Sequence, residues 1–403
     1  MARISLDARC AEVSRLWLAG GRRPSTIGVY LNWVRHFHED CALREVTTEA
    51  LLTRDLVDAF AARYAHARRC MPGLARAGAR NALHAWYCAL KTLDVTVPPW
   101  IEPKKPMVLA RIVSEFVEYR VHHRGVARTT PRGDARYVSA FLAFLRARGR
   151  HAGIARVADI DDFVLTCAKR WTTKTVAGMC SVLRAFLRFR FASGRLRQDL
   201  AAAVVSPRTR SHDRPPRAMP WKDVQRLLKA IDVRASLGRR DYAMLLAMAT
   251  YGMGAGEVLG LRIDDIDWEA RVLHVRRPKT GGSMRLPLLD GVGRALAAYL
   301  RHGRPRHAAA REVFVSHGMP FQRLTGASAI RHRLVKYAAA AGLSPAFIGS
   351  HVLRHSHACR QIELGATPKV VSDILGHRRP SSTSAYVRVA TERLRALALP
   401  VPR

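Results

Sequence analysis

An interruption near the middle of the chain most constrains how it can fold. Residues 204–219 are rich in proline and arginine and show no apolar period. They are therefore expected to form an exposed basic linker and not part of a core. The whole chain has 403 residues, more than one hydrophobic core normally holds. We expect separate domains before and after the linker.

The part before the linker is expected to be helical and internally repeated. Its patterns begin at clusters of Ser, Thr, Pro or Asp and continue with apolar residues at helical spacing. Tyr30 and Tyr137 occupy matching places in two such patterns. This favours two related helical modules, residues 1–102 and 103–203. The alternative is a chance similarity between amphipathic helices.

The part after the linker combines helical patterns with one expected β-hairpin. Two short apolar segments flank residues 278–282, PKTGG, which form a typical turn sequence. Helical patterns precede and follow this hairpin. The expected fold is mainly α with a small β-sheet, and the last domain is expected to span residues 220–403.

The charge of the chain points to a polyanionic partner. Lys and Arg number 68 against 31 Asp and Glu, which gives a formal net charge of +37. A surface of this kind repels itself unless a polyanion neutralises it, and nucleic acid is the usual one. A coding bias towards arginine is the alternative, but it would not explain the excess of cations over anions.

Cysteine usage and hydropathy favour a cytoplasmic protein. The seven cysteines are odd in number and form no Cys-x-x-Cys pair, which suits reduced, buried thiols better than disulfides. The N-terminus lacks the apolar core of a signal peptide. No segment approaches the roughly 18 apolar residues of a membrane helix, so we expect no membrane partner.

Residues 351–389 concentrate histidines and arginines around one tyrosine, Tyr386. A metal site is the first interpretation to test. Structural zinc uses paired Cys or His ligands, and a His-Glu-x-x-His site needs a glutamate between its histidines. The pair His351 and His355 meets neither condition, and Arg354 would repel a dication. We therefore expect no metal.

Phosphodiester chemistry fits this segment better. Without a metal, cleavage needs fixed cations to neutralise the transition state, a nucleophile and a proton donor. Arginine presents a fork that matches phosphate oxygens, histidine carries a proton near neutral pH, and tyrosine supplies a phenol. His351, Arg354, His377 and Tyr386 provide these groups in order.

The spacing of these residues resembles a known family. The segments HVLRHSHA and ILGHRRPSSTSAYVRV, with RRDYAMLLAMATYGMGAGEVLGLRIDDIDW upstream, resemble the conserved boxes of the tyrosine recombinase (phage integrase) family, of the transposon or integrative-element type. The resemblance implies helical SAM-like core-binding modules followed by a tyrosine-recombinase catalytic domain. The implied parts are an N-terminal DNA-binding module (1–102), a core-binding domain (103–203), a basic linker (204–219) and a catalytic domain (220–403).

The resemblance also implies a role for each matching residue. Tyr386 would attack the scissile phosphate and leave a 3′-phosphotyrosyl link and a free 5′-hydroxyl. Arg354 would hold the non-bridging oxygens. His351 and His377 would bond the same phosphate or assist proton transfer. Lys279, in the hairpin turn, would protonate the leaving 5′-oxygen.

The resemblance implies a supporting role for one further residue. Glu257 matches an acidic position of the family that braces the site. His355 and His357 lie beyond the matched positions and are expected to pack or to face solvent. No metal and no cofactor is implied, because the phosphotyrosine bond conserves the energy needed for religation.

The chain departs from the family pattern at one catalytic position. The first box normally reads Gly-Leu-Arg-x-x-Glu, and residues 252–257 read GMGAGE. Gly254 therefore stands in place of the first catalytic arginine. By analogy with the loss of an oxyanion donor, this should cost about 2.7–4 kcal/mol of transition-state stabilisation. Arg239 or Arg240, upstream on the same helical pattern, would have to reach in to replace it.

Two functions follow from these features. The first is a site-specific DNA recombinase. The second, favoured by Gly254, is a catalytically weak or silent DNA-binding subunit that needs an active partner. A type IB topoisomerase shares the chemistry, but two clamp-like modules favour recombination. The implied partners are double-stranded DNA and a homo-tetramer or an assembly with sister recombinases, at the bacterial nucleoid.

Overall fold

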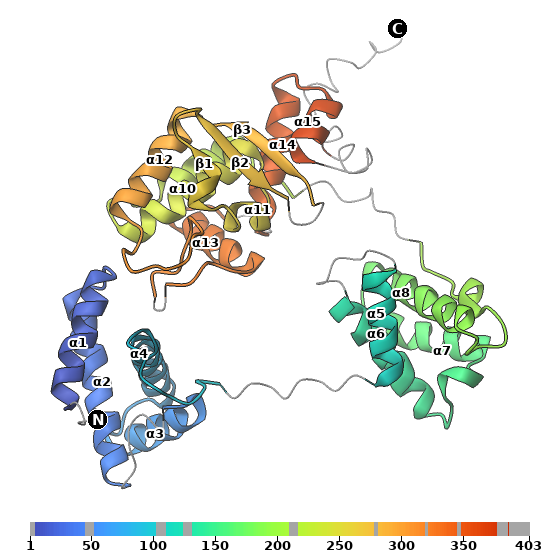
Figure 1. Cartoon of the computed structure of the whole chain (residues 1–403), viewed down its shortest axis with the longest axis horizontal. Coiled ribbons are helices and arrows are strands. Elements are labelled where there is room, and N and C mark those ends of the chain that lie inside the picture. Colours follow the sequence, from blue (N-terminus) through green and yellow to red (C-terminus); the bar gives the residue numbers. More distant parts are fainter. Residues whose placement is uncertain are drawn as a thin grey trace. The chain divides into compact units, whose positions relative to one another are not determined.

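A computed structural model describes most of the chain and resolves it into two compact units. One unit consists of residues 104–214, and the other joins residues 1–103 with 215–403. Figure 1 follows the chain by colour. The described residues are 5–44, 52–101, 110–123, 131–208, 217–277, 281–318, 321–344, 348–376 and 386.

The N-terminal residues form amphipathic helices around an aromatic core. The Ser5 hydroxyl accepts a hydrogen bond from the Ala8 N–H and caps the first helix. Trp17, Phe37 and Trp86 are at most 2% exposed, so they supply much of the apolar area buried here. The helices are α1 (Leu6–Ala19), α2 (Pro24–Ala42), α3 (Arg54–Ala67) and α4 (Pro72–Thr92).

The unit of residues 104–214 is also helical and has its own core. Phe116, Phe141 and Phe186 are fully buried in it, and the rings of Phe116 and Phe186 meet edge to face. Its helices are α5 (Arg111–His122), α6 (Pro131–Arg146), α7 (Val157–Ala168) and α8 (Thr173–Ala192), with short 3-10 turns at Ala152–Ile154 and Leu200–Ala203. The exact domain borders remain predictions.

The residues after the linker pack around α10 (Ser236–Tyr251), which is buried on nearly all sides. This explains its almost unbroken run of Ala, Met and Leu. Figure 1 shows α10 beside α12 and behind the small sheet. The other helices are α9 (Trp221–Lys229), α11 (Ala255–Leu259), α12 (Asp290–His302), α13 (Ala327–Ala340), α14 (Val352–Glu363) and α15 (Pro368–Leu375).

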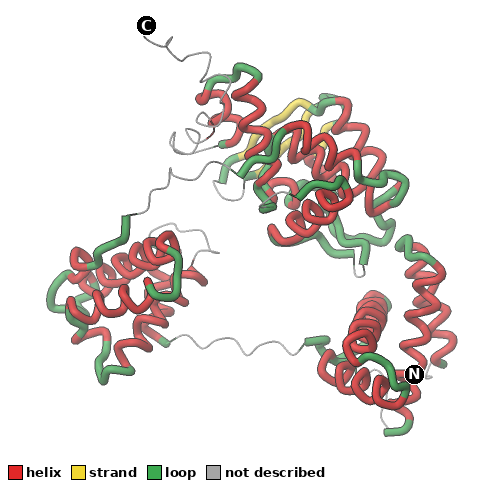
Figure 2. Tube along the Cα trace, turned by 180° about the vertical axis from the view of Figure 1, so that it is seen from behind, coloured by secondary structure: helices red, strands yellow, loops and turns green. Residues whose placement is uncertain are grey.

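The sheet has the strand order β1-β2-β3 and is antiparallel. Its strands are β1 (Ile266–Asp267), β2 (Val272–Arg276) and β3 (Ser283–Pro287). Leu273 and Val275 of β2 face the core, and Arg276 pairs with Ser283 at the end of the hairpin. The predicted fold class, mainly α with a small sheet, is confirmed (Figure 2).

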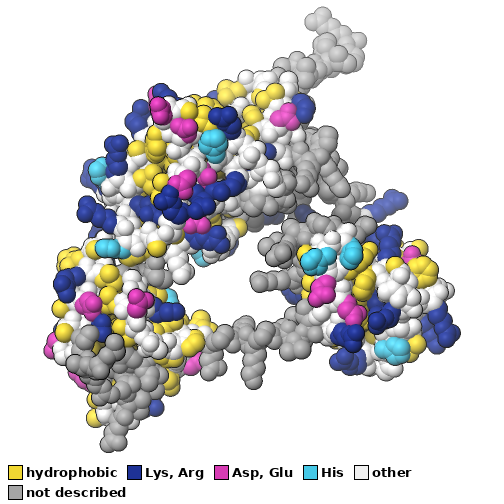
Figure 3. All heavy atoms as spheres, in the orientation of Figure 1, with side chains coloured by type: hydrophobic (Ala, Val, Ile, Leu, Met, Phe, Trp, Pro, Cys, Tyr) yellow, Lys and Arg dark blue, Asp and Glu magenta, His cyan; other side chains and the backbone are white. Residues whose placement is uncertain are grey.

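The described surface agrees with the basic composition. Figure 3 shows Lys and Arg side chains spread over this face of both units, with Asp and Glu side chains between them. Across the described helices, none combines the length and apolar character needed to cross a membrane. None of the seven cysteines, all of which lie in the described ranges, forms a disulfide, and Cys70 is exposed.

Candidate active site

Arg354 is anchored by three parts of the C-terminal fold. It lies in the first turn of α14, and its side chain is 15% exposed. Its Nη1 donates to the Gly252 carbonyl (2.9 Å) and to Glu257 Oε2 (3.2 Å), and its Nη2 donates to the Leu375 carbonyl. The guanidinium is thus fixed where α10, α11 and α15 end or begin.

Glu257 serves two groups at once. Its Oε2 accepts the Gly254 N–H (2.7 Å), which satisfies a free donor at the start of α11, and the same oxygen accepts from Arg354. The side chain is 16% exposed. The carboxylate that was expected to brace the site therefore connects the α10–α11 turn with α14.

The turn between α10 and α11 requires glycine at position 252. Gly252 has a φ of 66°, in the left-handed region, and an added Cβ would lie 2.7 Å from His357 Cδ2. His357 is buried, and its Nδ1 donates to the Ala249 carbonyl (3.0 Å). Burial lowers the pKa of His357, and the buried ring packs inside the fold, which is one of its two predicted environments.

Replacing Gly252 with alanine is expected to destabilise the C-terminal part of the fold. The left-handed conformation alone costs about 1–2 kcal/mol for a residue with a Cβ, and the contact with His357 adds to this. Gly291→Ala in α12 is the matched control, because nothing lies within 4 Å of its added Cβ. In urea unfolding, Gly252→Ala should lose stability and Gly291→Ala should not. Equal unfolding midpoints for the two variants would contradict the need for glycine at position 252.

Gly254 is not required by the backbone. Its φ of −76° and ψ of 160° suit any residue. An added Cβ would lie 3.6 Å from Glu257 Oε2 and 3.8 Å from Arg354 Nη1, at ordinary contact distance. A side chain at this position would therefore point at the Arg354–Glu257 pair. Glycine at position 254 therefore leaves the site without a side chain there, although the backbone conformation of the turn does not require glycine.

Arg277, which was not among the predicted site residues, lies at the same Arg354–Glu257 pair. It directly follows β2, and its side chain is 13% exposed. Its Nε lies 3.8 Å from Glu257 Oε1, and its Nη2 donates to the Ile374 carbonyl. The available signal was the basic doublet of Arg276 and Arg277 at the end of a strand that leads into the hairpin turn.

Tyr386 is buried beside α14. It is 4% exposed, and its hydroxyl lies 2.8 Å from His355 Nδ1. Burial raises the pKa of Tyr386 to about 12, while the charge of Arg354 opposes this. His355, predicted to pack or to face solvent, instead contacts the expected nucleophile. The ring of His351, the exposed residue just before α14, lies 6.3 Å from the ring of His355.

Two predicted residues, Lys279 and His377, lie outside the described residues. The residues that lead to them do meet. Arg277 stands two positions before Lys279, and Gly376 directly precedes His377. A Cβ added at Gly376 would overlap the Arg277 guanidinium, and Gly376 has a φ of 64°. Glycine is therefore needed here for both reasons.

The assembled groups suit an anion. Arg354 and Arg277 bring two cations to one carboxylate, Glu257. Guanidinium groups stay protonated and match phosphate oxygens with paired donors. Within the described ranges, no group of three or more His, Cys, Asp or Glu side chains could hold a metal ion.

Comparison with known proteins shows to which family the chain belongs. Residues 217–393 match the phage integrase family. The protein "Putative integrase/recombinase y4rF" of Sinorhizobium fredii (strain NBRC 101917 / NGR234) is 31% identical over 413 residues, covering 100% of this chain and 93% of the relative. The chain belongs to the phage integrase family of tyrosine recombinases. The family prediction made from the boxes is thereby confirmed.

Other members of the family and solved structures agree with this. Tyrosine recombinase XerD of Lacticaseibacillus casei is 29% identical over 291 residues, covering 71% of this chain and 96% of the relative. The XerH recombinase in a post-cleavage complex with difH has a TM-score of 0.59 at 14% identity, covering 77% of this chain and 88% of that one. The Tn1549 transposon integrase has a TM-score of 0.53 at 20% identity, covering 70% and 99%. At such identities these two structures show the fold.

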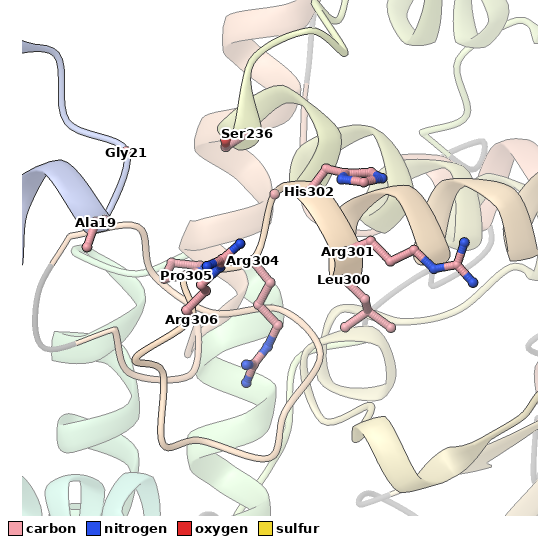
Figure 4. A pocket seen from close by; sticks show the side chains of 11 residues that line it. Ala19, Gly21, Ser236, Leu300, Arg301, His302, Arg304, Pro305 and Arg306 are labelled. Carbon is pink, nitrogen blue, oxygen red and sulfur yellow. The ribbon is translucent and has the colours of Figure 1, made fainter.

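Two surface pockets lie elsewhere in the unit formed by residues 1–103 and 215–403. One is lined by residues 19–21, Ser236 and residues 300–306 (Figure 4). The other is lined in part by Arg240 and His317. Neither pocket includes Arg354, Glu257, Arg277 or Tyr386.

Proposed function

We propose that this chain is a site-specific DNA recombinase that cleaves and rejoins duplex DNA through Tyr386. The observation that carries the proposal is the cluster around the first turns of α14, where the Tyr386 hydroxyl contacts His355 and Arg354 influences its pKa. A nucleophilic phenol and an anchored guanidinium are the groups that phosphoryl transfer without a metal requires.

In the proposed reaction the Tyr386 oxygen forms a bond to the scissile phosphorus while the bond to the 5′-oxygen breaks. The phenol proton leaves during attack, and the 5′-oxygen gains a proton from Lys279. His351 and His377 bond the phosphate or assist these transfers. The 3′-phosphotyrosyl bond is then attacked by a 5′-hydroxyl, which restores both the DNA and the free tyrosine. Neither a metal nor a cofactor enters the proposed steps.

The proposed partners are double-stranded DNA and further recombinase subunits. Solved structures of similar fold include a lambda integrase tetramer bound to a Holliday junction, with a TM-score of 0.53 at 16% identity. We propose a homo-tetramer, or an assembly with sister recombinases, on paired sites at the nucleoid in the cytoplasm. The modules of residues 1–102 and 103–203 would bind one face of the DNA and residues 220–403 the other. The net charge of +37 supports extensive phosphate contact.

Covalent trapping tests the proposed function. Duplexes from the DNA that flanks the gene would carry a nick, so that the short 5′-hydroxyl fragment diffuses away after cleavage. We expect an adduct that survives denaturation and carries a 3′-phosphate link. After digestion with trypsin and nuclease, mass spectrometry should place the nucleotide on the peptide that contains Tyr386. An adduct on another residue, or no adduct on any duplex that the protein binds, would contradict the proposal.

Gly254 supports a second candidate, a silent DNA-binding subunit. In that case the wild-type protein would bind DNA without forming an adduct, and Gly254→Arg or an added sister recombinase would produce one. The adjacency of position 254 to Arg354 and Glu257 makes this substitution informative. If wild type forms the adduct unaided, the silent-subunit interpretation is wrong.

A further inference from the structure

We propose that Arg277 supplies the second guanidinium of the phosphate site and takes the place of the arginine missing at position 254. This rests on the proposed function, because it assigns a residue to the same reaction. It also accounts for how a chain with Gly254 could keep an active site. Arg277 would contact a non-bridging oxygen of the scissile phosphate.

The first support is the shared anchoring of the two arginines. Arg354 donates to the Leu375 carbonyl and Arg277 to the Ile374 carbonyl, so consecutive carbonyls at the end of α15 hold both side chains. On the other side they face the two oxygens of Glu257, at 3.2 Å for Arg354 and 3.8 Å for Arg277. The guanidiniums are therefore neighbours, positioned by the same two structural elements.

The second support is a hydrogen-bond donor of Arg277 that has no acceptor in the described part of the chain. The Arg277 Nε is buried and has no hydrogen-bond partner among the described residues. Burial lowers the pKa of Arg277, and the charge of Arg354 acts in the same direction, against the effect of Glu257. A buried donor without an acceptor is costly, and the two guanidinium groups share the single negative charge of Glu257. A phosphate oxygen at this pair would supply both an acceptor and a compensating charge.

The third support is the fixed origin of the side chain. The Arg277 N–H donates to the Gly282 carbonyl (2.8 Å), and the Arg277 carbonyl accepts from the Gly281 N–H (2.9 Å). Both backbone groups thus close the base of the hairpin turn that carries Lys279. The absence of a Cβ at Gly376 leaves the space that the guanidinium occupies.

The other arginines considered for this role are engaged elsewhere. Arg239 donates to the His302 carbonyl (3.0 Å). Arg240 is 2% exposed and donates to Asp241 and to the Val315 carbonyl. Replacement of the missing cation from α10 is therefore not supported. Arg277 reaches the site from the hairpin.

The test compares Arg277→Gln with Arg276→Gln. Arg276 is the neighbouring arginine, and it pairs with Asp265 at 2.6 Å as an exposed side chain. Arg277→Gln is expected to slow adduct formation about 10²–10³-fold, the range for loss of one oxyanion-hole donor. Arg276→Gln should remain close to wild type. Thermal unfolding and gel shift would verify that both variants fold and bind DNA.

Two further experiments distinguish a contact between Arg277 and the phosphate from a purely structural role of Arg277. On a duplex with a neutral methylphosphonate at the scissile position, most of the Arg277→Gln defect should disappear, because less charge needs neutralising. Gly254→Arg should restore activity to Arg277→Gln, because its side chain would point at the same Glu257–Arg354 pair. Equal defects on both substrates, together with no rescue, would overturn the assignment.

A binding arm keeps the inference testable if the proposed function fails. In a Tyr386→Phe background, the protein should bind the phosphate duplex more tightly than the methylphosphonate duplex, and Arg277→Gln should reduce that preference. Failure of wild type to form an adduct would reject catalysis by this chain alone. An unchanged preference after Arg277→Gln would reject the role of Arg277.

Discussion

Replacing Tyr386 with phenylalanine is expected to abolish covalent capture of DNA while the fold and DNA binding persist. The ring packs in a small cluster with Ala358, Ile362, Val371 and Leu375, and phenylalanine preserves that packing. Only the hydroxyl is lost, with its hydrogen bond to His355, which is worth about 0.5–1.5 kcal/mol. Denaturing gels would measure the adduct, and gel shift would measure binding.

Tyr242→Phe is the matched control for this experiment. Tyr242 is a half-buried tyrosine of α10 that packs against the main core of the same domain, and its variant should form the adduct at the wild-type rate. A normal adduct with Tyr386→Phe would show that another residue attacks the phosphate. Loss of the adduct in both variants would show that removing a tyrosine hydroxyl impairs the protein generally, and it would not identify Tyr386 as the nucleophile.

The environment of Tyr386 also indicates how its proton must be handled. Because burial raises its pKa to about 12, the hydroxyl is protonated near neutral pH, and the proposed attack requires its proton to leave. A phenol bonded to a ring nitrogen can transfer its proton there when that nitrogen is unprotonated. His355 Nδ1 is the group in that position.

Arg354→Gln is expected to impair both activity and stability. The guanidinium joins α14 to the Gly252 carbonyl, Glu257 and the Leu375 carbonyl. Glutamine cannot make all three contacts, and loss of one partner from a largely buried ion pair costs about 3–5 kcal/mol. Loss of the phosphate contact should slow adduct formation by at least about 10²-fold. Urea unfolding and trapping kinetics would measure the two effects.

Arg360→Gln provides the control on the same helix. Arg360 is 38% exposed and pairs with Glu363, and an exposed pair of this kind contributes about 0–1 kcal/mol. Its variant should therefore match wild type in both measurements. If Arg354→Gln unfolds at the wild-type urea concentration, the guanidinium does not hold the three segments together as described.

Local patterns in the sequence predicted the mainly helical fold, the hairpin and the family. They succeed there because helical periodicity and turn residues act over short distances along the chain. The spacing also pointed to Glu257 and Arg354, which the structure brings together. Arg277 and His355 were missed as site residues because their contacts are distant in sequence: Arg277 meets Ile374, and His355 meets Tyr386. The tertiary fold brings these residues together, because Arg277 joins the hairpin to the end of α15 and Tyr386 packs against α14 and α15.

The double use of Glu257 has an evolutionary consequence. One carboxylate caps α11 and faces both arginines, so substitutions at these positions should not have independent effects. An arginine gained at position 254 would make the guanidinium at position 277 dispensable, whereas loss of Arg277 from a chain with Gly254 would leave one cation for the phosphate. Residues 254 and 277 would therefore be expected to covary among relatives, with the catalytic cation supplied from either the α11 turn or the hairpin.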